Sequence, residues 1–119
     1  MLRLINLDND TIIAEQVRVA DKFWSRMKGL MFTEGLPSGC GLHLRPCRGI
    51  HTFFMRCSID VLHLDSHHQV VGIEKNLQPG QIGKFFPKTA EIVELSTGII
   101  QKTETKVGHR LSFQMQTKI

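Results

Sequence analysis

The sequence predicts a mainly β fold with one short helix, and two stretches carry most of that prediction. Residues 2–7 and 11–19 alternate apolar with polar side chains or are rich in β-branched residues, and an Asp-Asn-Asp turn separates them. Residues 60–65 and 69–74 repeat this arrangement around a Ser-His-His turn. Both stretches are typical of β-hairpins. The chain has 119 residues, of which 41% are hydrophobic and 22% charged, a composition and length ordinary for a single globular domain over residues 1–119.

A short amphipathic helix is predicted over residues 21–28. Asp21 is a favourable N-cap, and Phe23 and Met27 lie four residues apart on one face. Gly29 follows and can end the helix in a left-handed conformation. The apolar face of this helix is expected to pack on the sheet.

The remaining segments are short. The expected elements are strands at 42–44, 50–55, 91–95 and 110–115, a helical turn within 99–105, and an ordered loop at 76–90 anchored by Phe85 and Phe86. A loop as long as 76–90 is unusual in so small a domain, and such loops are often functional.

Composition and charge narrow the function classes. No run of about 18 apolar residues is present, so no membrane-spanning helix is expected, and the N-terminus lacks the pattern of a signal peptide. The net charge of +4 comes from scattered cations, and no nucleic-acid-binding signature accompanies it, so nucleic acid is not favoured as a partner. Three cysteines without a C-x-x-C pair indicate reduced thiols and a cytoplasmic location. We expect a monomer or a weak dimer.

The stretch from residue 46 to residue 60 concentrates the chemistry-bearing side chains of the chain. A thiol, a guanidinium, an imidazole, a hydroxyl and two aromatic rings fall close together there. Apolar walls with a few convergent polar groups are typical of small-ligand sites. The candidate ligand-binding residues are Arg48, His51, Thr52, Phe53, Phe54, Met55 and Asp60.

Two alternatives use the same stretch differently. Cys47 lies beside Arg48 and four residues before His51, so a cysteine-dependent enzyme would take Cys47 as nucleophile and His51 as base. The competing structural interpretation is that Phe53 and Met55 belong to the core and His51 is a hydrogen-bonded, buried histidine. In the same interpretation Cys47 is simply buried, as free cysteines commonly are.

A His/Cys metal site is the other alternative, in which His51 and His63 face each other across neighbouring strands with Asp60 or Asp65 near. The spacing of these residues fits no zinc pattern, so no metal ligands are assigned. The candidate ligands in this interpretation are Cys47, His51, His63, His67 and His68.

Several segments, in this order along the chain, resemble the small bacterial and archaeal family called DUF192 or UPF0127. They are Arg26-Met27-Lys28-Gly29-Leu30-Met31-Phe32, Gly41-Leu42-His43-Leu44, His51-Thr52-Phe53-Phe54-Met55, Ile59-Asp60-Val61, Val93-Glu94-Leu95, Gly98 and Gly108. The resemblance covers nearly the whole chain. It implies a compact, mainly β antiparallel fold of the sandwich or jelly-roll type with minor helix, and it implies no established activity.

These observations together favour a binding module for a small molecule or a protein partner, with its site around residues 47–60. The balance is against an enzyme, and the sequence does not say whether a cofactor is bound. The ligand itself is not identified by any motif in the chain.

Overall fold

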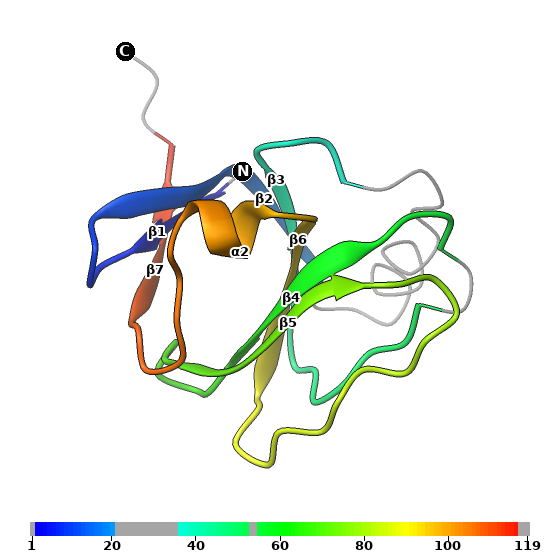
Figure 1. Cartoon of the computed structure of the whole chain (residues 1–119). Helices are drawn as coiled ribbons and strands as arrows, with labels where there is room; N and C mark the ends of the chain where they lie inside the picture. Colours follow the sequence, from blue (N-terminus) through cyan, green and yellow to red (C-terminus); the bar gives the residue numbers. More distant parts are fainter. Residues whose placement is uncertain (1, 21–35, 53–54, 117–119) are drawn as a thin grey trace.

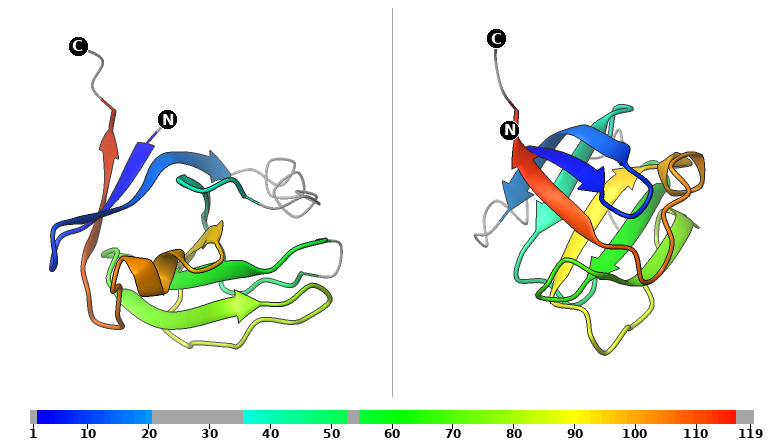
Figure 2. Two further views of the ribbon diagram at one scale, coloured as in Figure 1. Left: turned by 45° about the horizontal axis from the view of Figure 1, so that its top comes forward. Right: turned by 90° about the vertical axis from the view of Figure 1, so that its left-hand side faces the viewer.

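One seven-stranded sheet makes up most of the computed structural model, and it curls until its two ends approach each other (Figure 1; Figure 2). The structure describes residues 2–20, 36–52 and 55–116. The strand order is β5-β4-β6-β3-β2-β1-β7. The elements are β1 (Leu2–Asn6), β2 (Thr11–Ala20), β3 (Cys40–Leu44), β4 (Ile59–Leu64), β5 (Val70–Leu77), β6 (Glu91–Ser96), α2 (Ile99–Lys102) and β7 (Leu111–Met115).

The strand pairs of the sheet are antiparallel except β2 and β3, which run parallel. The two edge strands meet at one end of the curl, where Gln69 and Arg110 form an isolated bridge and Val70 exchanges backbone hydrogen bonds with Gly108 and His109. The predicted mainly β class is therefore confirmed. The two layers expected of a sandwich are two parts of one curled sheet, as the left view of Figure 2 shows.

Both predicted hairpins are confirmed, and short polar side chains fix their turns. The Asn6 side-chain oxygen accepts a hydrogen bond from the Asp8 amide at 3.0 Å. In the second hairpin one carboxylate oxygen of Asp65 accepts from the amides of His67 and Gln69, each at 2.9 Å. Such contacts satisfy turn amides that have no partner in the ladder, which sets the register of the flanking strands.

The buried apolar residues form two clusters, one on each face of the sheet. Strand β6 shows the alternation: Val93 and Leu95 belong to the cluster inside the curl, and Ile92 belongs to the cluster on the outer face. The inner cluster consists of Leu4, Ile13, Ala14, Val17, Leu62, Leu64, Val70, Val93, Leu95, Ile100 and Leu111. The outer cluster consists of Ala20, Leu42, Leu44, Cys47, Ile50, Met55, Ile59, Val61 and Ile92.

Most of the shorter predicted elements that the structure describes are confirmed, and one is wrong. The strands predicted at 42–44, 91–95 and 110–115 are confirmed as β3, β6 and β7, and the helical turn as α2. The predicted helix at 21–28 lies outside the described residues. The strand predicted at 50–55 is wrong for the part that the structure describes, where His51 forms only an isolated bridge to Ile82.

The reason is that the described apolar residues of this segment, Ile50 and Met55, cover the sheet instead of extending it. Ile50 and Met55 are 8% and 6% exposed and belong to the outer cluster, which they reach from an irregular connection between β3 and β4. Burial on the face of the sheet removes these apolar side chains from water, and this does not require the backbone to form a strand.

Candidate functional site

Two irregular segments run side by side and enclose a hollow near the outer face of the sheet. Thr52 donates its amide to the Gln81 carbonyl at 2.8 Å, and Gly83 donates to the Ile50 carbonyl at 2.9 Å. The space between the segments is about 400 Å³. We call it the cationic hollow, and its lining residues are Arg48, Gly49, Ile50, His51, Ile82, Gly83, Lys84 and Phe85.

Thr52 fastens the two segments together from below. Its side chain is buried, and its hydroxyl donates to the Gln78 carbonyl at 2.6 Å and accepts from the Gln81 amide at 2.9 Å. Its carbonyl accepts from the Gly80 amide at 2.8 Å. A buried hydroxyl with partners on both sides holds the 76–90 loop in one position against residues 50–52.

The rim combines positive charge with exposed apolar surface. The Arg48 guanidinium carbon lies 5.8 Å from the centre of the Phe85 ring, within the range of a cation–π contact. Phe85 is 67% exposed and Ile82 is 73% exposed. Lys84 and the half-buried His51 complete the rim. A ligand with an anionic group beside an apolar group matches this pattern.

Beneath the rim lies a buried network of polar side chains. His63, with no exposed surface, contacts a Glu74 carboxylate oxygen through Nε2 and the Thr89 hydroxyl through Nδ1, both at 3.1 Å. The same Glu74 oxygen accepts the Lys84 amide at 2.7 Å, so the network ends at the hollow. Burial lowers the pKa of His63 below its usual value, and the hydrogen bond and charge of Glu74 oppose that shift in part.

Glycine at position 83 allows the loop to lie directly on this network. A Cβ atom there would stand 3.1 Å from a Glu74 carboxylate oxygen and 3.2 Å from the Ile50 carbonyl oxygen. The loop predicted to be anchored by Phe85 and Phe86 is in fact anchored by Phe86, whose ring centre lies 4.4 Å from that of His63. Phe85 instead points to solvent on the rim.

The structure brings some of the sequence-predicted site residues together and separates others. Arg48 and His51 line the cationic hollow. Asp60 lies on the inner face, where its carboxylate accepts from the amides of Asn76, Gly98 and Ile100 at 2.9–3.0 Å and holds the start of α2. Phe53 and Phe54 lie outside the described residues, and Met55 is in the outer cluster.

Cys47, the candidate nucleophile, is a core residue by position. It is 4% exposed, belongs to the outer cluster, and its thiol donates to the Gly49 carbonyl at 3.2 Å. A side chain so little exposed is poorly accessible to a substrate from solution, which works against a role as nucleophile.

The histidines proposed as metal ligands lie apart, and His51 pairs with Ile82 in the loop rather than facing His63 across neighbouring strands. His67 is exposed in the turn. His63 belongs to the network with Glu74, whereas His68 lies beside His43 and Glu91. Burial lowers the pKa of His43, and the hydrogen bond from its ring to Glu91 opposes that shift. The sequence did not single out His43 and Glu91. Each lies in a segment whose apolar residues already predict a strand, so nothing local marks the polar residue as functional.

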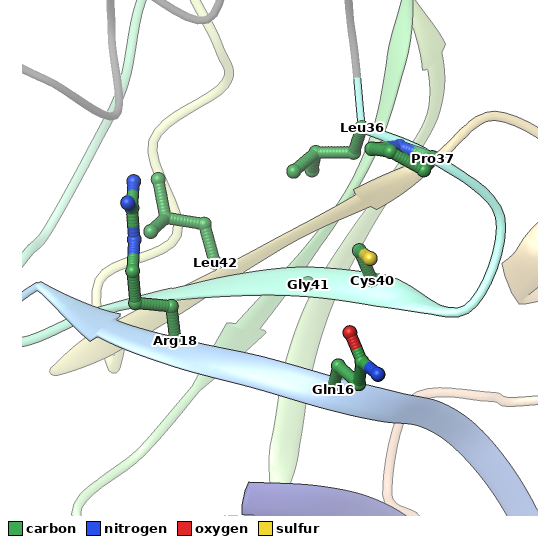
Figure 3. A pocket seen from close by; sticks show the side chains of 7 residues that line it. All are labelled: Gln16, Arg18, Leu36, Pro37, Cys40, Gly41 and Leu42. Atoms are coloured by element: carbon green, nitrogen blue, oxygen red, sulfur yellow. The ribbon is translucent and has the colours of Figure 1, made fainter. Parts of the chain in front are cut away.

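A second, smaller hollow of about 190 Å³ lies on the parallel pair β2 and β3 (Figure 3). Figure 3 shows the Gln16, Arg18, Cys40 and Leu42 side chains on one side of the two strands, facing Leu36 and Pro37. The register places Leu42 opposite Glu94 of β6.

Glu94 is the most perturbed carboxyl group of the described residues. It is 2% exposed, and burial raises its pKa from 4.5 to about 7. Its Oε2 atom has no hydrogen-bond partner among the described residues. Glu94 shares the outer face with Ile92, two residues before it, so the carboxyl lies in apolar surroundings.

The fold and the site define a small curled-sheet protein with a cationic, partly apolar hollow between two loops. Residues 4–113 match the DUF192 family, described as an uncharacterized ACR, and the chain belongs to that family. A UPF0127 protein of Thermococcus sibiricus is 32% identical over 123 residues, which cover 95% of this chain and 75% of that protein. One from Pyrococcus furiosus is 35% identical over 115 residues, which cover 92% and 97%.

Solved structures share the fold. A protein of unknown function from Novosphingobium aromaticivorans superposes with a TM-score of 0.76 at 16% identity, covering 93% of this chain and 82% of that one. A protein from Sinorhizobium meliloti described as a "putative transcription regulator" gives 0.75 at 19% identity, covering 94% and 91%. No helix in the described ranges is both long and apolar enough to span a bilayer.

Proposed function

We propose that this protein is a binding module and that the cationic hollow is its site. The ligand is a small molecule that carries a carboxylate, sulfonate or phosphate group next to an apolar group. The observation that carries the proposal is the meeting of Arg48, Lys84 and two largely exposed apolar side chains, Ile82 and Phe85, around one space of about 400 Å³. That volume lies in the range of small-molecule sites, about 300–1,000 Å³.

The roles of the side chains follow from their positions. Arg48 and Lys84 attract and orient the anionic group. Phe85 and Ile82 cover the apolar group, since large exposed apolar side chains gain the most free energy when a ligand removes them from water. His51 supplies a further polar contact at the rim.

A second set of residues supports the site from underneath. Thr52 fixes the two loops to each other, and the Glu74–His63 pair carries the loop that bears Lys84. A site held by buried hydrogen bonds loses little conformational entropy on binding.

An anionic aromatic probe tests the proposal. Anilinonaphthalene sulfonate is titrated into the wild type and into Arg48→Ala, Lys84→Ala and Phe85→Ala. We expect each substitution to raise the Kd by about three- to tenfold, equivalent to about 0.7–1.4 kcal/mol. Lys102→Ala and Val107→Ala are matched controls, because both residues are exposed and neither lines the hollow. Equal affinities in all six proteins would contradict the proposal.

Native mass spectrometry of the protein purified without chelator addresses the natural ligand. We expect a discrete mass excess that disappears on denaturation and is absent from Arg48→Ala. If instead the probe fails to bind and an acidic peptide with an aromatic residue binds, the module serves a protein partner. The cysteine-dependent alternative has less support, since Cys47 is buried. Reaction of Cys47 with iodoacetamide faster than free cysteine would revive it.

A further inference from the structure

We propose that His43, His68 and Glu91 form a binding site for a divalent transition-metal cation such as zinc. One potential ligand atom from each residue lies within 4.8 Å of the other two. Nε2 of His43 is 2.6 Å from Glu91 Oε1, and Nε2 of His68 is 3.2 Å from the same oxygen. Two imidazoles and one carboxylate are a common set of protein ligands for zinc.

The fold brings these three side chains together from distant parts of the chain. His43 is in β3, Glu91 is the first residue of β6, and His68 lies in the turn between β4 and β5. The sheet register fixes the first two, because β3 and β6 are paired neighbours and His43 lies opposite Val93, two residues from Glu91. Residues two apart on a strand face the same side, so His43 and Glu91 both point inside the curl.

Both imidazoles are held in place by the same aromatic ring. Phe113 stacks on His43 with centroids 4.1 Å apart and rings inclined by 5°, and it meets His68 edge-on at 5.0 Å. His68 also sits at φ 63° in a turn that Asp65 fixes through two backbone amides. The ligands are therefore placed before any metal arrives, which lowers the entropic cost of binding.

Both imidazoles direct Nε2 at the cluster. His43 is 1% exposed, and its Nδ1 has no hydrogen-bond partner among the described residues, so the polar contacts of the ring are made through Nε2. A cation 2.0–2.2 Å from each ligand atom requires those atoms to lie no more than about 4.2 Å apart. Metal binding therefore requires side-chain movement, because His43 Nε2 and Glu91 Oε1, 2.6 Å apart, must separate to admit the cation.

The site opens towards solvent on one side. Glu91 also lines a surface hollow of about 360 Å³ with Arg45, Pro46 and Ala90. Three protein ligands and an open fourth position are the arrangement of zinc sites that bind water or a substrate. Arg45 is the nearby charge that opposes a cation, since it also disfavours protonation of His43, and the Glu91 carboxylate compensates for it.

Equilibrium dialysis of the full chain against zinc chloride tests the site, with Cys40, Cys47 and Cys57 either free or alkylated. We expect one zinc per chain, independent of alkylation. The test variants are His68→Gln and Glu91→Gln, because both side chains are partly exposed and glutamine keeps a hydrogen-bonding group there. Each should weaken binding at least about tenfold, the lower end of what the loss of even an outer metal partner costs. His67→Gln, the exposed neighbour, is the matched control and should bind as the wild type does.

Cobalt provides a second readout, which reports on the coordination of the bound metal. We expect the visible absorption of a four- or five-coordinate Co²⁺ complex with the wild type and with His67→Gln, and its loss in His68→Gln and Glu91→Gln. Circular dichroism checks that these variants are folded. Zinc binding that survives both test substitutions, or that disappears on alkylation of the cysteines, would overturn the proposal. So would the absence of zinc from a folded wild-type chain.

Discussion

Glu94→Gln should remove a specific pH dependence from the stability of this protein. Burial raises the pKa of the folded Glu94 carboxyl from 4.5 to about 7. Below the lower value the group is protonated in both the folded and the unfolded chain, so it has no effect. As the pH rises from 4.5 towards 7, the unfolded chain releases this proton and the folded chain keeps it. The free energy of unfolding of the wild type therefore falls with rising pH through this window.

The size of the effect follows from the two pKa values. The interval between 4.5 and about 7, at about 1.4 kcal/mol per pH unit, corresponds to about 3 kcal/mol. Glutamine is neutral at every pH and has nearly the same shape. The difference in unfolding free energy between Glu94→Gln and the wild type should thus shift by about 3 kcal/mol in favour of the variant between about pH 4.5 and pH 7.5.

Urea denaturation followed by circular dichroism at both pH values measures this difference. Comparing variant with wild type cancels the opposite contribution of His63, whose lowered pKa makes the folded state lose stability as the pH falls below 6.5. Glu104→Gln is the matched control, because Glu104 is exposed. The reasoning is refuted if Glu94→Gln and Glu104→Gln differ from the wild type by the same amount at both pH values.

Two further predictions concern the scaffold. Gly72→Ala should lower the free energy of unfolding by about 2 kcal/mol, because the new Cβ would lie 2.5 Å from the Phe86 ring. Gly49→Ala is the control: its Cβ would meet open space, so the free energy of unfolding should change by less than about 0.5 kcal/mol. Equal effects of the two substitutions in urea denaturation would contradict this prediction. Asp60→Ala should lower the free energy of unfolding by at least about 3 kcal/mol, because it leaves three backbone amides without their acceptor. Hydrogen exchange of the Ile100 amide should become faster than in the wild type. Unchanged protection of that amide would show that Asp60 does not hold α2.

Local patterns predicted the strands well, because the signals that define a hairpin are local. Alternation and a polar turn suffice to place β1 and β2, or β4 and β5. The same reasoning failed at the described residues 50–52 and 55, where Ile50 and Met55 are apolar because they cover the outer face of the sheet. Periodicity reports which side chains are buried, and it does not report whether the backbone makes ladder hydrogen bonds.

The sequence predicted the residues that one of the two loops contributes to the candidate site, but not those of the other loop. Arg48 and His51 stood out because they lie in a stretch crowded with polar and aromatic side chains. Lys84 did not, because the bridge between His51 and Ile82 joins segments 31 residues apart, and no local pattern specifies such a pairing. The unusual length of the 76–90 loop was the one signal that pointed to it.

The His43–Glu91 contact escaped the sequence analysis for a related reason. These residues are 48 positions apart, and they meet because β3 and β6 are neighbours in the sheet. The strand order of a curled sheet depends on the packing of the whole chain rather than on the sequence of any one strand.

The most direct test of the proposed site is a map of where an anionic aromatic ligand binds. Amide ¹H–¹⁵N spectra of the labelled protein are recorded during titration with naphthalene sulfonate. We expect the largest shift changes at Arg48–His51 and at Ile82–Phe85, with the Gly49 and Gly83 amides as well-resolved reporters. Shifts confined to the β2–β3 hollow around Cys40 and Gly41, or no shifts at all, would contradict the assignment of the cationic hollow as the binding site.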